Sequence, residues 1–265
     1  MMTELAWTAG GSRLRFVPWL GFALALLAGV LLALGPIGWR FGLWNFRVSF
    51  WYLMEPSVFV GAGAFVLSLV GLAGARGIGG LARAAAVLGL LGGALFVYYP
   101  LQFYAKVAPL PFIGNTPLPR IHDITTDPEN PPQFAATLAA RAAEKGGSPV
   151  YAGAALAQQQ RAGYPDIVPL KSALPPAETF QRALKVAQGM DRWTIVRTDP
   201  AAGIIEGSAH SLFMGFTDDF VIRVSPDGSG SRVDMRSESR QGISDFGVNA
   251  ARIQSYMAAL KAQLG

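Results

Sequence analysis

The chain has 265 residues, of which 51% are hydrophobic and only 15% are charged, and its formal net charge is +5 at pH 7. Globular proteins carry about 25% charged residues, so the composition argues against a wholly water-soluble protein. The absence of cysteine excludes a disulfide framework, a thiolate metal site and a cysteine nucleophile.

The charged residues are distributed unevenly along the chain. Up to Phe103 the sequence has six arginines and two acids, whereas beyond it sixteen Lys/Arg accompany fifteen Asp/Glu. The arginines of the first part flank apolar segments. The basic balance therefore indicates membrane borders, and we predict no nucleic-acid partner.

Three apolar segments near the start of the chain are long enough to cross a membrane. They are Phe16–Ile37, Val58–Ala75 and Ala84–Phe103, and none of them contains a charged residue. About 20 apolar residues span the hydrocarbon core as a helix. We therefore predict a three-helix transmembrane anchor over residues 1–105. Gly89 and Gly93 have a GxxxG spacing, which fits either packing within the bundle or dimerisation.

The basic residues beside these segments predict the orientation. One side of the membrane would hold four of them and the other three: Arg13, Arg15, Arg76 and Arg83 against Arg40, Arg47 and Lys106. Cytoplasmic loops carry the excess of Lys and Arg. We expect a multi-pass protein of the bacterial inner membrane, with a cytoplasmic N-terminus and a periplasmic C-terminal domain.

A proline-rich linker is predicted over residues 106–120, followed by a soluble domain over residues 121–265. Asn130-Pro131 is typical of a helix start, and this helix would end near Gly146. A second helix is expected over Ala152–Arg161. The remaining pattern predicts, in order, strand Ile167–Leu170, helix Glu178–Gln188, strands Trp193–Thr198, Ile204–Leu212, Phe220–Ser225 and Arg232–Arg240, and a helix capped by Ser244 that ends at Leu264. This is an α+β domain with a four- to five-stranded antiparallel sheet packed by helices.

The last two predicted strands alternate between apolar and charged residues. Phe220, Ile222 and Val224 fall on one face, whereas charged side chains such as Arg223 fall on the other. Such alternation predicts a half-buried sheet. If Ser225 pairs with Arg232, then Arg223 lies opposite Asp234 as a cross-strand ion pair.

Several motifs in this region resemble those of one family. They are Phe216-Thr-Asp-Asp-Phe-Val-Ile-Arg223, Arg236-Ser-Glu-Ser-Arg240, Gly242, Asp245, Gly247, Asn249 and Arg252-Ile253, with Thr125-Thr-Asp-Pro-Glu-Asn-Pro-Pro132 and Tyr164-Pro165 upstream. Together they resemble the DUF1499 family over about Ile121 to Leu260. The family has no assigned activity and its members are often bacterial membrane or envelope proteins, so the resemblance implies a fold and a location more than a function.

One constellation of polar residues is a candidate ligand-binding site. Its members are Arg236, Ser237, Ser239, Arg240, Asp245, Asn249 and Arg252. Asp245, Asn249 and Arg252 share one face of the last helix because they are spaced i, i+4, i+7. Three guanidinium groups near hydroxyls could bind a phosphate or carboxylate head group. The alternative is a structural network in which Asp245 lies at the helix N-terminus and pairs with an arginine.

Two further groups contain chemically capable residues. His122, Asp123, Asp127 and Glu129 could ligate a metal, but their spacing favours turn and capping duties. His210 shares a strand face with Glu206 and Ser208, but no nucleophile signature accompanies it. Asp218-Asp219 is expected to cap or turn the strand before Phe220. We therefore predict no catalytic residue, no metal ligand and no cofactor.

Three functions remain open. The first is a binding or interaction module for a lipid head group, an envelope molecule or a partner protein, with membrane lipids and an anionic ligand as partners. The second is a hydrolase or transferase acting on a membrane-proximal substrate, with His210, Asp218 and Asp219 as candidates. The third is a structural subunit of a membrane complex or homo-oligomer. The sequence favours the first, non-enzymatic, function.

Overall fold

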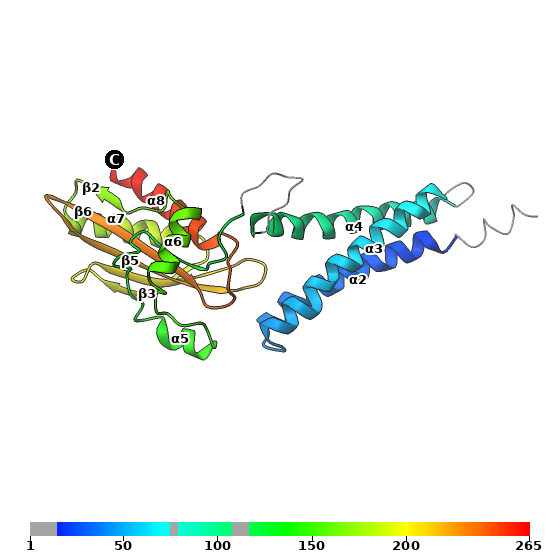
Figure 1. Ribbon diagram of the computed structural model, residues 1–265, viewed down its shortest axis with the longest axis horizontal. Helices are drawn as coiled ribbons and strands as arrows, with labels where there is room; N and C mark the ends of the chain where they lie inside the picture. The colour runs from blue at the N-terminus through cyan, green and yellow to red at the C-terminus, as the bar shows by residue number, and fades with distance from the viewer. Residues whose placement is uncertain (1–14, 75–78, 108–116) are drawn as a thin grey trace, which may run out of the picture. The chain divides into compact units, whose positions relative to one another are not determined.

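The computed structural model describes residues 15–74, 79–107 and 117–265 (Figure 1). They divide into two compact units, Met1–Tyr104 and Ala105–Gly265. The predicted linker over 106–120 lies largely outside the described residues, as do Arg13 and Arg76 of the orientation argument.

The described elements of the first unit are all helical. Its elements are α2 (Val17–Arg40), the π-helical segment η1 (Val48–Met54), α3 (Glu55–Ala73) and α4 (Gly80–Val107). Because η1 runs directly into α3, the described residues of this unit contain three helices that are long and apolar enough to cross a membrane. In hydrocarbon the backbone must satisfy its own hydrogen bonds, which helices do. The prediction of three membrane-length apolar helices is confirmed.

The glycines at GxxxG spacing lie in tight contacts between these helices. A methyl group on Gly93 would lie 2.5 Å from the backbone nitrogen of Phe65 in α3. One on Gly89 would lie 2.3 Å from Oγ of Ser68 in α3 and 2.9 Å from the carbonyl carbon of Gly21 in α2. Both approaches are closer than any side chain permits. The Gly89–Gly93 pair therefore packs α4 against its own bundle, the first of the two alternatives.

The second unit is built on one antiparallel sheet. Its strands are β1 (Asp123–Thr125), β2 (Leu170–Ser172), β3 (Trp193–Asp199), β4 (Ile204–His210), β5 (Thr217–Asp227) and β6 (Gly230–Ser239). The order is β1-β6-β5-β4-β3, and β2 also pairs with β6. The α+β prediction is confirmed. β1 was not expected, because three residues are too few to show a strand period.

The helices of this unit lie on both sides of the sheet. They are α5 (Leu138–Ala143), α6 (Ala154–Gly163), α7 (Pro176–Gly189) and α8 (Val248–Leu264). Figure 1 shows α7 and α8 on one side and α5 on the other. The apolar core lies under α7 and α8, where Trp193 stacks against Phe220 and Tyr256 and the Tyr256 hydroxyl donates to the carbonyl of Ala183 at 2.9 Å.

The predicted strand register is confirmed. Ser225 pairs with Arg232, and Arg223 lies opposite Asp234. The Arg223 guanidinium lies 3.0 Å from the Asp234 carboxylate. Asp127 contacts the same guanidinium at 2.9 Å, so the cross-strand pair is part of a larger ion-pair group.

The structure corrects the start of two predicted helices. No helix begins at Asn130-Pro131: α5 begins only at Leu138, because the Glu206 carboxylate accepts the backbone N–H groups that precede it. Ser244 does not cap the last helix. Instead Asp245 accepts the N–H of Asn249 at 2.6 Å, and α8 begins at Val248.

The prediction that the polar face of the sheet is exposed to solvent was also wrong. Asp219, Asp234 and Arg236 on that face are fully buried. The segment that contains α5, which we call the covering segment, lies over this face and contributes charged partners of its own. Both faces of the central strands are therefore buried, one under apolar and one under polar contacts.

Candidate functional site

Seven charged residues meet on the polar face of the sheet, and we call them the buried charge cluster. They are Asp123, Arg141, Glu144, Asp219, Arg236, Glu238 and Arg240. Strands β5 and β6 place Asp219 directly opposite Glu238, and side chains opposite each other share a face. Charged residues are almost never fully buried unless they are paired, so each member needs a partner within the fold.

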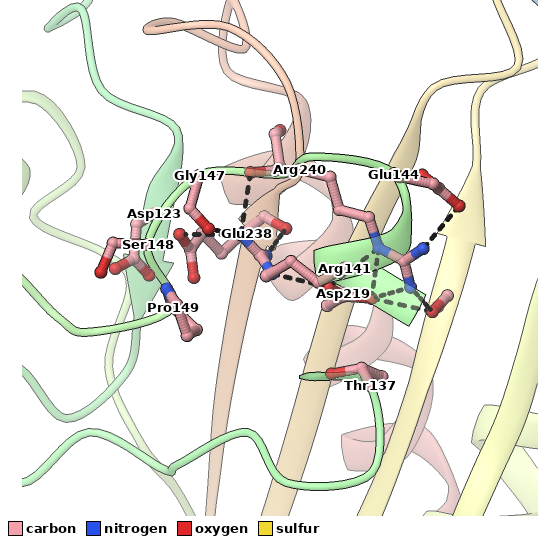
Figure 2. Close-up of polar contacts among 12 residues, drawn as sticks. Asp123, Thr137, Arg141, Glu144, Gly147, Ser148, Pro149, Asp219, Glu238 and Arg240 are labelled. Atoms are coloured by element: carbon pink, nitrogen blue, oxygen red, sulfur yellow. Dashed lines mark hydrogen bonds and ion pairs between the residues drawn. The ribbon is translucent and has the colours of Figure 1, made fainter. Parts of the chain in front are cut away.

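Arg141 of α5 lies at the centre of this cluster (Figure 2). Its Nε donates to Asp219 at 2.9 Å and its Nη1 to the Glu238 carboxylate at 3.2 Å. Its other nitrogen donates to the Glu238 carbonyl at 3.1 Å. Only 2% of this side chain is exposed. One guanidinium thus joins two strands to the covering segment.

Arg236 forms the most complete pair of the cluster. Its Nε and Nη2 each donate to one oxygen of Asp123 at 2.9 Å, the forked geometry that suits a guanidinium and a carboxylate. Its carbon Cζ lies 4.7 Å from the centre of the Phe134 ring and 5.5 Å from that of Tyr151. The side chain is therefore held by charge and by aromatic faces together.

Arg240 closes the cluster at its solvent side. It donates to Asp219 at 2.7 Å and to the Ser208 hydroxyl at 3.1 Å. Its third nitrogen donates to Glu144 at 2.6 Å, and that carboxylate is 45% exposed. The cluster thus reaches solvent through Glu144, whose contact with Arg240 is drawn in Figure 2.

Three arginines against four carboxylates leave the cluster one negative charge in excess when every acid is ionised. The pKa of Glu238 is raised to about 8, chiefly by burial and then by the neighbouring Asp123 carboxylate, against the opposing effect of Arg141. When Glu238 holds a proton, positive and negative charges are equal. The cluster is therefore balanced within the fold and leaves no guanidinium charge uncompensated for an external anion.

A second polar group lies on the opposite face, under α8. The Ser237 hydroxyl donates to Asn249 at 2.7 Å, and the Asn249 amide donates to the Ser239 hydroxyl at 2.9 Å. Arg252 pairs with Asp218 at 2.5 Å. This group attaches α8 to the ends of β5 and β6.

The predicted ligand-binding constellation is thus divided by the sheet. Arg236 and Arg240 lie in the buried charge cluster on one face. The remaining members lie on the face under α8 or at the start of that helix: Ser237, Ser239, Asp245, Asn249 and Arg252. The three arginines do not converge, because Arg252 lies on α8, which covers the face opposite to that of Arg236 and Arg240. Burial raises the pKa of Asp245, which caps α8.

Asp218 and Asp219 were expected to cap or turn a strand, and this was wrong. Both lie inside β5, on opposite faces, and each pairs with an arginine. Arg141, which pairs with Asp219, was missed by the sequence interpretation. The signal available was one arginine within an alanine-rich stretch, Leu138–Ala143.

The residues with metal-ligand chemistry are separated. Asp123 pairs with Arg236, Asp127 with Arg223 and Glu129 with Arg161. In the part of the chain that the structure describes, no group of three such residues could hold a metal ion.

The strand face with His210 contains no assembled triad in the described contacts. Oγ1 of Thr217 lies 3.4 Å from Nδ1 of His210, whereas Ser208 donates to Asp219 at 2.9 Å. Glu206 accepts backbone N–H groups of the covering segment. The three side chains therefore have separate partners.

One surface feature was not predicted from the sequence, a group of exposed apolar side chains that we call the apolar end cluster. Its members are Leu212, Phe213, Ile243 and Val248, with 70%, 51%, 70% and 43% of their surface exposed. They lie in the β4–β5 loop, in the β6–α8 loop and at the start of α8. Both loops leave the sheet at one end, opposite the β3–β4 and β5–β6 turns (Figure 1).

The chain from the linker enters the domain at this same end. The carbonyl of Ile121 accepts the N–H of Asp245 at 3.3 Å. A methyl group on Gly247 would lie 3.1 Å from Cδ1 of Leu118. We call this end of the sheet the tether end.

Comparison with known families assigns this domain to a family. The family described as a protein of unknown function, DUF1499, matches residues 123–260, more than half of the chain. The chain belongs to the DUF1499 family. Its DUF1499 domain thus includes the whole sheet, the buried charge cluster and the apolar end cluster.

Other comparisons add little to this assignment. A comparison with curated proteins finds no match. The crystal structure of Ara h 8.0201 is similar at a TM-score of 0.23 and 11% identity over 36% of this chain and 93% of that chain. The crystal structure of TTHA0849 from Thermus thermophilus gives a TM-score of 0.22 and 14% identity over 37% and 91%. Similarity at this level supports no conclusion about the function of the DUF1499 domain.

Proposed function

We propose that the chain is a membrane-anchored interaction module of the bacterial inner membrane. Its DUF1499 domain would lie in the periplasm and bind a membrane lipid, an envelope molecule or a partner protein. The excess of arginine on the N-terminal side of the spans supports this orientation.

The observation that carries the proposal is the apolar end cluster. Exposed apolar side chains are common singly, but several of them at one end of a sheet are more typical of an interaction site. Here Phe213 and Ile243 occupy two loops that leave neighbouring strands at one end of the sheet, and both are more than half exposed.

The arginines of the buried charge cluster are engaged inside the fold, which leaves recognition to another part of the surface. Arg236 and Arg240 neutralise carboxylates inside the fold, so removing them would unpair buried charges. Their role is to hold the covering segment on the sheet. Recognition is therefore assigned to the apolar end cluster.

A crosslinking experiment in native membranes tests this function. A photoreactive phenylalanine analogue replaces Phe213 in the full chain, and the matched control has it at Val196, an exposed residue of β3. We expect adducts with lipid or protein at position 213 in excess of those at 196. Equal, background-level adducts at both positions would contradict an interaction site at this end.

A further inference from the structure

We propose that the apolar end cluster inserts into the surface of the bilayer that anchors the chain. The inference rests on the interaction function proposed above and names its partner. The occupant is a phospholipid surface, into which the tips of the β4–β5 and β6–α8 loops would dip. Amphipathic surfaces that present large apolar side chains bind the membrane interface in this way.

The chemistry of the two loops suits lipid. The β4–β5 loop, residues 211–216, has no charged residue, and its Ser211 hydroxyl accepts the N–H of Phe216 at 2.9 Å. The β6–α8 loop has two charged residues. The Asp245 carboxylate accepts two backbone N–H groups of the chain, and Arg240 pairs with Asp219 and Glu144 inside the domain. Inserting charges is the main cost of entering a membrane, and Phe213 and Ile243 each have uncharged residues on both sides in the sequence.

The position of the tether end favours the anchoring bilayer over a distant partner. Nine residues, 108–116, separate Val107 at the end of α4 from Pro117. A chain extends at most about 3.6 Å per residue, so a connection of this length can reach no farther than about 36 Å. Residues 118–121 contact the β6–α8 loop directly. The short tether therefore gives the apolar end cluster a high effective concentration at the membrane.

Among the described residues of the domain, the exposed large apolar side chains outside the cluster are Leu138, Val150, Val168 and Val196. Two of them lie away from the tether end. Val168 and Val196 are 58% and 49% exposed. Val168 precedes β2 at one edge of the sheet, and Val196 lies within β3 at the other. Neither lies in a loop at the tether end, so they serve as matched controls of the same hydrophobic kind.

Spin labels in the full-length chain test the insertion. Because the natural chain has no cysteine, single Phe213→Cys, Ile243→Cys, Val168→Cys and Val196→Cys variants can each be labelled with one nitroxide. The proteins are reconstituted in vesicles of pure phospholipid. We expect labels at 213 and 243 to gain collisions with oxygen and to lose most of their collisions with a water-soluble nickel chelate, relative to 168 and 196.

A charge placed in the cluster provides a second measurement. With the label at 243, the Phe213→Asp substitution should restore access of the nickel chelate, because an inserted carboxylate is costly. Val196→Asp with the same label should leave access unchanged. Phe213 is an exposed residue, so the substitution acts on the surface and not on the core.

Three results would overturn the inference. One is nickel access at 213 and 243 equal to that at the control sites. Another is dipolar broadening between labels of two copies, which would assign the cluster to a second copy of the chain. The third is a combination: position 213 crosslinks to protein in native membranes, whereas the spin labels remain accessible to the nickel chelate in pure phospholipid vesicles. In that case the interaction function would stand and the lipid partner would not. Loss of both the adducts and the insertion would end both proposals.

Discussion

The residue that connects most of the DUF1499 domain is Arg141. It contacts Asp219 of β5 and Glu238 of β6 from the covering segment, and all three side chains are buried. A buried ion pair contributes little net stability compared with apolar packing, but removing one partner leaves an uncompensated charge. The cluster is therefore expected to be sensitive to single substitutions.

Substitution of Arg141 tests this sensitivity. We expect Arg141→Met to lower the free energy of unfolding by about 3–5 kcal/mol, because Asp219 and Glu238 lose their shared cation. The control is Arg161→Met, which breaks an exposed pair with Glu129 and should change it by no more than about 0.5 kcal/mol. Pulse proteolysis in increasing urea measures both. Similar values for the two variants would show that the cluster is not needed for the fold.

The raised pKa of Glu238 predicts a pH dependence of stability. A glutamate in an unfolded chain titrates near about 4.3, whereas in the fold its pKa is about 8. Between these values the folded state holds a proton that the unfolded state has released. Glu238 therefore contributes fully to the free energy of unfolding below its pKa in the unfolded chain. This stabilisation is lost as the pH rises through its pKa in the folded protein.

The measurement compares the thermal unfolding temperatures of the natural chain and of Glu238→Gln at about pH 5 and about pH 8.5. These two pH values enclose most of the range between the unfolded and folded pKa values of Glu238. We expect the natural chain to lose more stability on raising the pH, since glutamine cannot ionise. Glu144→Gln, which changes the exposed carboxylate of the cluster, should keep the natural slope. An unchanged slope in Glu238→Gln would assign the pH dependence to other groups.

At the level of elements, alternation in the sequence predicted the sheet well. The register that places Arg223 opposite Asp234 follows from a period of two along β5 and β6. The same period also implies that Arg236 and Ser237 point to opposite faces. The ligand-binding constellation grouped them by closeness in sequence, which a strand does not preserve.

What could not be predicted depends on contacts distant in sequence. Asn130-Pro131 has a local preference for a helix start, but Glu206, about 70 residues later, binds the backbone of Ala135, Ala136 and Thr137. The burial of the polar face has the same origin. Alternation shows which residues share a face and not what covers them.

In the membrane unit, the close contact at Gly93 predicts a strong effect of a small change. Gly93→Ala would place a carbon 2.5 Å from the Phe65 nitrogen, so α4 must shift away from α3. Gly80→Ala, also in α4, meets no atom within 4 Å and is the matched control. We expect only Gly93→Ala to lower the temperature at which the chain aggregates in detergent. Equal temperatures for the two variants would contradict the packing described for the bundle.

For the whole molecule, the proposed topology has the three apolar helices crossing the membrane and the DUF1499 domain in the periplasm. An odd number of spans places the two ends of the anchor on opposite sides. The helices are long and apolar enough for this, and the proposed direction rests on the arginine distribution.

Labelling with a membrane-impermeant maleimide in intact spheroplasts tests this topology most directly. A single cysteine replaces Val196 in β3 or Gly79 in the connection between α3 and α4, both of which are exposed positions. We expect the cysteine at 196 to react in intact spheroplasts and the one at 79 to react only after the membrane is disrupted. Reaction of the cysteine at 79 in intact spheroplasts, with protection of the one at 196, would contradict the account.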